Sequence, residues 1–265
     1  MPGRTEYIEK YGPAAAELAQ RGYGTVAVDF RGQGLADRLL PDAIKGHVEA
    51  FADYQLDMAA VMAWVQAQGF AQPLFLMGHS MGGNIGLRAL MAGLPVRAVA
   101  FSAPMWGIRI SAVMRPMVAP IAAVLRAMGK SLAYAPTTGP MPYVLKAAFA
   151  GNTLTTDRGM WDFMQEHLAA APELSLGGPT VQWLQLAVAD CAALARLPSP
   201  ALPAYCALGT HERIVDTGAI HRRMKAWPGA RFDIIPGAEH EVMMEQPAIR
   251  AQFFDAACGL FDAQR

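Results

Sequence analysis

The sequence has few charged residues and no excess of either sign. Charged side chains make up 17% of the 265 residues, with 22 basic and 22 acidic residues. A balanced chain of this kind creates no overall field that would attract nucleic acid, so we expect no nucleic-acid partner. Apolar residues make up 53% of the sequence, and the chain is long enough to bury them in a substantial core.

Cysteine is scarce as well. Cys191, Cys206 and Cys258 form an odd set with no C-x-x-C spacing. Neither a disulfide framework nor a zinc site is indicated, so we expect reduced thiols, a cytoplasmic location and no metal. The N-terminal residues show no apolar run behind a basic stretch, so no secretory signal is visible.

The sequence lacks an uninterrupted apolar run of membrane-spanning length. The longest apolar stretch, 108–128, contains three arginines and two prolines. Charges are costly in a bilayer core, so the stretch predicts a surface-active helical segment. We expect it to make no more than transient contact with a membrane surface.

Strand-like and helix-like patterns alternate along both ends of the chain. Short β-branched or apolar runs predict strands, and apolar residues at helical spacing predict helices between them. This alternation predicts an α/β fold, with a mostly parallel central sheet flanked by helices. The predicted strands are 25–30, 73–77, 96–101, 204–208 and 231–235, and the predicted helices are 13–21, 47–68, 83–92, 180–195, 218–227 and 248–261.

The middle of the chain departs from this rhythm. Residues 104–197 contain apolar helical stretches separated by glycine and proline, with no good strand candidate. We interpret them as a helical cap inserted into a core formed by residues 1–103 and 198–265. The proline-containing segment 198–203 resembles a hinge where the chain returns to the sheet.

One short motif carries the chemistry. Residues 78–82 read Gly-His-Ser-Met-Gly, a G-x-S-x-G sequence between an apolar strand and a helix. In this context the glycines permit a sharp turn that exposes the hydroxyl of Ser80, and the following helix offers free N–H groups to a developing oxyanion. The pattern predicts that Ser80 is a nucleophile.

A serine nucleophile needs a histidine base and an acid to orient that base. His240 follows the last predicted strand in a loop, where the sites of open α/β sheets gather. The loop after the strand 204–208 holds two carboxylates, Glu212 and Asp216, and either could orient His240. Asp216 also suits the acidic cap of the helix that follows.

The remaining histidines fit other roles. His79 lies inside the serine motif, where we expect it to point away from the nucleophile. His47, His167 and His221 lie in predicted helices, where packed or solvated roles are more common.

Three segments together resemble the monoacylglycerol lipases and, more closely, the bacterial lysophospholipases of the L2 type, a group classed with serine aminopeptidase-like hydrolases. They are residues 78–83 (GHSMGG), 29–34 (DFRGQG) and 236–241 (PGAEHE). The resemblance spans essentially the whole chain and implies the α/β-hydrolase fold. It assigns the acid to Glu212, and it implies that the backbone N–H groups of Arg4 and Met81 form the oxyanion hole.

The resemblance also predicts a gap in the sheet. In relatives the turn equivalent to residues 2–6 follows strands that precede Met1 in this numbering, and one of these normally pairs between 25–30 and 73–77. Its absence would leave backbone groups unpaired in a buried place. This suggests the hypothesis of an N-terminally truncated or misassigned reading frame.

The function that follows is hydrolysis of a carboxylic ester with a lipid-like alcohol or acyl part, such as a lysophospholipid or a monoacylglycerol. This chemistry needs no cofactor. Apolar cap residues, foremost Met105, Trp106 and Trp183, are candidates to receive an acyl chain, with Met114, Met117 and Met128 nearby in sequence. The alternatives are a peptidase or thioesterase on the same scaffold, and a non-catalytic or truncated homologue.

Overall fold

The computed structural model describes residues 1–111 and 113–265. The strands are β1 (Leu76–His79), β2 (Val99–Ser102), β3 (Ala204–Gly209) and β4 (Arg231–Ile235). The α-helices are α1 (Gly12–Gln20), α2 (Tyr54–Ala67), α3 (Ser80–Met91), α4 (Val118–Ala127), α5 (Tyr143–Lys146), α6 (Arg158–Ala170), α7 (Val181–Leu194), α8 (Thr217–Lys225) and α9 (Pro247–Asp262).

The four strands form one parallel sheet in the order β1-β2-β3-β4. The central strands β2 and β3 are buried along their whole length, as expected for parallel strands covered on both faces. The predicted α/β class with a mostly parallel sheet is therefore confirmed.

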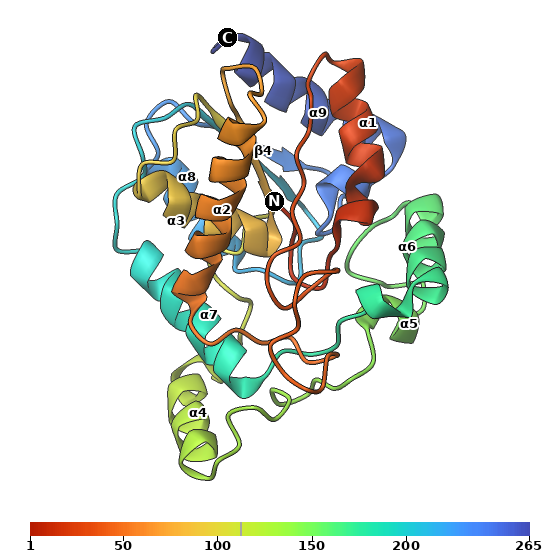
Figure 1. The fold of residues 1–265 in the computed structure, drawn as a ribbon, viewed down its shortest axis with the longest axis vertical. Coiled ribbons are helices and arrows are strands. Elements are labelled where there is room, and N and C mark those ends of the chain that lie inside the picture. Colours follow the sequence, from red (N-terminus) through yellow and green to blue (C-terminus); the bar gives the residue numbers. More distant parts are fainter. Residues whose placement is uncertain (112) are drawn as a thin grey trace.

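Helices cover both faces of the sheet, so the core has two halves (Figure 1). Val99 and Phe101 of β2 pack with residues of α2, α3, α7 and α8. Ala98 and Ala100 point the other way and pack with α1 and α9. This alternation follows from the period of two along a strand, and it gives the three-layer arrangement of an open α/β sheet.

The predicted strand 25–30 is wrong. The segment joins no ladder in the described chain, because a cavity of about 720 Å³ lies between it and β1. The cavity is lined by Val26 and Val28 on one side and by Leu76 and Met77 on the other. Met1 occupies only the end of this gap: its ammonium donates to the Met77 carbonyl at 2.8 Å.

The predicted helix 47–68 is shorter than expected, since α2 begins at Tyr54. His47 lies outside it, and its Nδ1 hydrogen-bonds the Thr180 hydroxyl at 2.9 Å. Thr180 is in turn the N-cap of α7, where its hydroxyl accepts from the Trp183 N–H. The apolar spacing before Tyr54 thus reflects packing against the middle of the chain rather than a helix.

Residues between β2 and β3 form α4, α5, α6 and α7, and none of those described lies in a strand of the sheet. The division of the chain into a core and a cap at residues 104 and 197 stays a prediction. Across the described residues, no helix combines the length and apolarity needed to cross a membrane.

Candidate active site

Ser80 lies at the sharp turn between β1 and α3. Its φ is 49°, a left-handed conformation that costs a residue with a Cβ roughly 1–3 kcal/mol. Two glycines permit the turn. A Cβ on Gly82 would collide with the Met1 carbonyl oxygen, and a Cβ on Gly78 would lie 3.0 Å from the Gly82 oxygen. The G-x-S-x-G spacing is therefore a requirement of this close packing.

His240 and Glu212 form a buried hydrogen-bonded pair. The His240 Nδ1 lies 2.6 Å from the Glu212 Oε2, and both side chains are almost completely buried. The second oxygen of Glu212 accepts backbone N–H groups from Ile214 at 2.6 Å and Val215 at 3.0 Å. These bonds fix the carboxylate, so that Nδ1 of His240 carries the proton and Nε2 is left free for a substrate-side partner.

Electrostatics in this pair favour its charged form. Burial alone would raise the pKa of Glu212, but His240 and the backbone N–H groups lower it below its ordinary value. Burial alone would lower the pKa of His240, but the charge and hydrogen bond of Glu212 raise it. An imidazolium formed during a reaction would be stabilised where it forms.

Asp216 has the structural role that its position allowed. It is the N-cap of α8, and its side chain accepts from the Ala219 N–H at 3.2 Å. Its other oxygen pairs with Arg115 at 3.1 Å. The two carboxylates that the sequence left open are thus separated by the structure, with Glu212 at the histidine and Asp216 at the helix.

His79 packs against the proposed base, and its orientation away from the nucleophile stays a prediction. Its ring packs against that of His240 at a centroid distance of 4.8 Å. The His79 Nδ1 donates to the Ser102 carbonyl at 3.0 Å, and burial lowers its pKa to about 3. His79 is therefore a neutral packing partner of His240.

The segment Pro2–Glu6 forms a tight turn beside Ser80. Thr5 has a φ of 67°, and the Gln33 side chain donates to the carbonyls of Gly3 and Glu6 at 2.8 and 3.1 Å. Arg4 lies in this turn, and Met81 is the second residue of α3, where backbone N–H groups have no partner inside the helix. The two predicted oxyanion donors thus belong to segments that flank the nucleophile.

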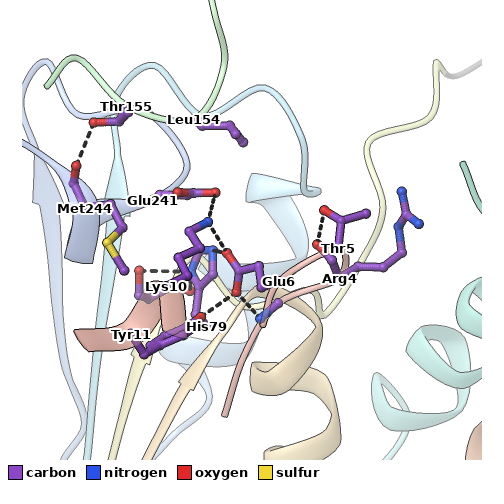
Figure 2. A network of polar contacts seen from close by, with 12 residues as sticks. Arg4, Thr5, Glu6, Lys10, Tyr11, His79, Leu154, Thr155, Glu241 and Met244 are labelled. Carbon is purple, nitrogen blue, oxygen red and sulfur yellow. Dashed lines mark hydrogen bonds and ion pairs between the residues drawn. The ribbon is translucent and has the colours of Figure 1, made fainter. Parts of the chain in front are cut away.

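A buried ionic cluster supports this turn (Figure 2). Glu6 accepts from the Gly3 N–H and the Tyr11 hydroxyl, and Lys10 donates to it at 2.7 Å. Lys10 also donates at 2.7 Å to Glu241, the residue after His240. One ammonium therefore connects the turn beside Ser80 to the loop that carries the base.

The charges of this cluster are set by Lys10. Burial alone would raise the pKa of Glu6, but the neighbouring ammonium holds it at about 2. Burial also raises the pKa of Glu241, against the pull of Lys10. Glu6, His79 and Glu241 bring potential metal-ligand atoms within 4.8 Å of one another, yet the ammonium already bridges the two carboxylates.

Sequence reasoning missed this cluster, although two signals were present. Glu6 and Lys10 have the i, i+4 spacing of a local ion pair. Glu241 follows the proposed base directly. Neither signal shows that the three side chains meet, because that contact depends on the tertiary fold.

Ser80 and His240 line one cavity of about 460 Å³. Met105 and Trp183 line it too, but Trp106 lies in the core, where its indole donates to the Gly83 carbonyl at 3.1 Å. Among the described residues, no hydrogen bond joins the Ser80 hydroxyl to His240, and such bonds often tighten only when substrate binds. The sequence candidates Met114, Met117 and Met128 are exposed instead.

Comparison with known proteins places this arrangement in a family. The family model described as "Serine aminopeptidase, S33" matches residues 1–247. The chain belongs to this family. It is 32% identical to lysophospholipase L2 of Escherichia coli K12, over 98% of this chain and 78% of the relative, and 28% identical to a probable lysophospholipase L2 of Haemophilus influenzae, over 94% and 78%.

Solved structures show the same fold. A soluble variant of the Saccharomyces cerevisiae monoglyceride lipase matches with a TM-score of 0.72 at 19% identity, covering 99% of this chain and 84% of that one. The Paleococcus ferrophilus monoacylglycerol lipase matches with a TM-score of 0.71 at 17% identity, covering 99% and 92%. The S33-family chain is therefore an α/β hydrolase.

The separation of the two carboxylates gives a first prediction. Glu212→Gln should lower kcat for a short-chain p-nitrophenyl ester by about 10³-fold or more, because the amide cannot orient or charge-stabilise His240. Asp216→Asn, its matched control, should stay within about threefold because a cap is not part of the chemistry. Steady-state kinetics on both variants, with circular dichroism to check the fold, tests this; the reverse ranking would exchange the two roles.

The ionic cluster gives a second prediction. Lys10→Met should lower the free energy of unfolding by about 3 kcal/mol, because it leaves two carboxylates buried without their counter-charge. Urea denaturation measures this loss. Adding Glu241→Gln to Lys10→Met should recover part of it, since the double change removes a complete ion pair.

Lys225→Met is the control for this series. Lys225 is exposed on α8, so its loss should change the unfolding free energy by no more than about 0.5 kcal/mol. Equal stabilities of Lys10→Met and Lys225→Met would show that the cluster does not stabilise the fold.

Proposed function

We propose that this chain hydrolyses lipid esters through an acyl-enzyme formed on Ser80, with His240 as the base and Glu212 as the acid. The observation that carries the proposal is the buried hydrogen bond that Glu212 accepts from His240, which lines the same cavity as Ser80. A strained serine at a strand-to-helix turn supports the same assignment.

The reaction proceeds in two steps. The Ser80 oxygen attacks the ester carbonyl while the imidazole of His240 takes the hydroxyl proton, and the backbone N–H groups of Arg4 and Met81 hold the oxyanion. Collapse breaks the ester C–O bond, and His240 returns the proton to the leaving alcohol. Water then attacks the acyl-enzyme by the same route, which releases the carboxylic acid and restores Ser80.

The substrate we favour is a lipid with a single acyl chain, a lysophospholipid or a monoacylglycerol. Apolar side chains dominate the cavity around Ser80, including Met105, Leu168 and Trp183, and such walls suit an acyl chain. The names of the relatives point to the same substrates. A peptidase or thioesterase would use the same residues and differ in the pocket.

We also propose that residues 104–197 act as a cap that meets a lipid surface. Val144, Leu154 and Leu176 from this part of the chain line the cavity. Val113, Val124 and Met128 are exposed at 81%, 59% and 58%. The segment 109–156 carries five arginines and lysines and no acidic residue, so its charge complements an anionic membrane surface.

The three cysteines are unpaired, which supports a reducing, cytoplasmic location.

The proposed catalytic assignment predicts active-site labelling. A fluorophosphonate probe should label the wild-type chain and fail to label Ser80→Ala, because the probe reacts only with an activated serine. Mass spectrometry of the labelled peptide locates the site. Labelling that persists in Ser80→Ala would place the nucleophile elsewhere, and labelling of neither protein would favour a non-catalytic homologue.

A panel of lysophospholipid, monoacylglycerol, acyl thioester and aminoacyl substrates then separates the substrate classes.

The cap proposal predicts binding to anionic lipid. Co-sedimentation with phosphatidylglycerol vesicles should exceed that with phosphatidylcholine vesicles, and Val124→Glu should reduce it about tenfold because it puts a carboxylate on the apolar, cationic face. Leu56→Glu is a matched control, since Leu56 is similarly exposed on α2. Equal binding by both variants would contradict a role of this face.

A further inference from the structure

Arg4 is a cation in the cavity of Ser80 that lacks a counter-charge. The other two basic side chains that line this cavity are each paired, Lys10 with Glu6 and Glu241, and Arg213 with Glu239 at 2.7 Å. Within residues 1–111 and 113–265, Arg4 has no ion pair with a carboxylate. Its positive charge is therefore available to an anion in the cavity.

The Arg4 side chain is nevertheless held in place. Its Nη1 donates to the Gly177 carbonyl at 3.0 Å, and its guanidinium lies 5.5 Å from the centre of the Trp183 ring. Gly46 leaves room for it, because a Cβ there would lie 2.8 Å from Nη1. A guanidinium has five N–H donors, and one carbonyl in the described chain satisfies only one of them.

Arg38 shows how this fold satisfies an arginine without a carboxylate. Arg38 also has no ion pair in the described chain, but its guanidinium donates to the carbonyls of Gly32, Gly34 and Glu173 at 2.8–3.2 Å. The Arg4 guanidinium donates to a single carbonyl, that of Gly177. Burial lowers the pKa of Arg4 to about 10. At neutral pH it is still protonated, so an anionic ligand would offset its desolvation.

We propose that the Arg4 guanidinium binds the phosphodiester of a lysophospholipid substrate and so selects it over an uncharged monoacylglycerol. This inference rests on the proposed function, because it places the scissile ester at Ser80. The Arg4 backbone belongs to the turn beside the nucleophile, and in a lysophospholipid only the glycerol unit separates the ester from the phosphate. Guanidinium groups suit phosphate because their fork of donors matches two phosphate oxygens.

A ratio of two substrates tests this assignment. The pair is 1-hexanoyl-glycero-3-phosphocholine and 1-hexanoylglycerol, both used as monomers so that surface binding plays no part. Arg4→Gln should lower the ratio of kcat/KM for the phosphocholine ester to kcat/KM for 1-hexanoylglycerol by about tenfold or more. Most of this loss should come from a higher KM for the phosphocholine ester. Arg4→Lys, which keeps the charge without the fork, should lie between wild type and Arg4→Gln. Because both substrates use the same oxyanion turn, a loss common to both cancels in the ratio.

Arg38→Gln is the matched control, since Arg38 is held by carbonyls outside this cavity. The ratio of kcat/KM for the two substrates in Arg38→Gln should equal that of wild type. An unchanged ratio in Arg4→Gln would overturn the proposal, whether or not stability falls. An unchanged ratio together with weaker inhibition by hexanoate would assign Arg4 to the acid product instead. A wild type that hydrolyses neither ester would refute the proposed function rather than this inference.

Discussion

The bridge that Lys10 makes between Glu6 and Glu241 is the interaction on which the active site depends most. It joins the two parts of the site that are farthest apart in sequence: the turn at residues 2–6 and the loop of His240. Without a counter-charge the two carboxylates would have to take up protons or leave the interior. The same carboxylate of Glu6 holds the Gly3 N–H, so the fold of the turn and the position of the base loop are connected through one ion.

The sheet supports this connection from below. β1 ends at the serine turn and β3 ends at the loop of Glu212, so parallel strands deliver both segments to the same edge. Two carbonyls from the middle of the chain, those of Thr153 and Leu154, accept the backbone N–H groups of His240 and Glu241. The base is thus fixed by backbone as well as side-chain bonds, and its loop is tied to the segment inserted between β2 and β3.

The sequence predicted the parts of this site that depend on local pattern. The strands 204–208 and 231–235 and the turn around Ser80 follow from apolar runs and glycine spacing, and they lie close to their predicted bounds. The run 25–30 failed because a strand needs a partner, and β-branched residues cannot show that the neighbouring position holds a cavity. Local spacing left the choice between Glu212 and Asp216 open for the same reason, and the family resemblance chose Glu212: only the tertiary fold decides which carboxylate meets a histidine 24 or more residues away.

Several features of this site oppose folding. Ser80 and Thr5 have backbone conformations that disfavour a Cβ, Lys10 and two glutamates are buried, and the half-buried Arg4 has no counter-charge in the described chain. Each of these costs stability by itself, yet all six residues line one cavity. A fold retains such a concentration of unfavourable local choices where the site has a use for them. The strain and the ion cluster are accounted for by positioning the nucleophile, the turn and the base, and a phosphate bound by Arg4 would offset the desolvation of its guanidinium.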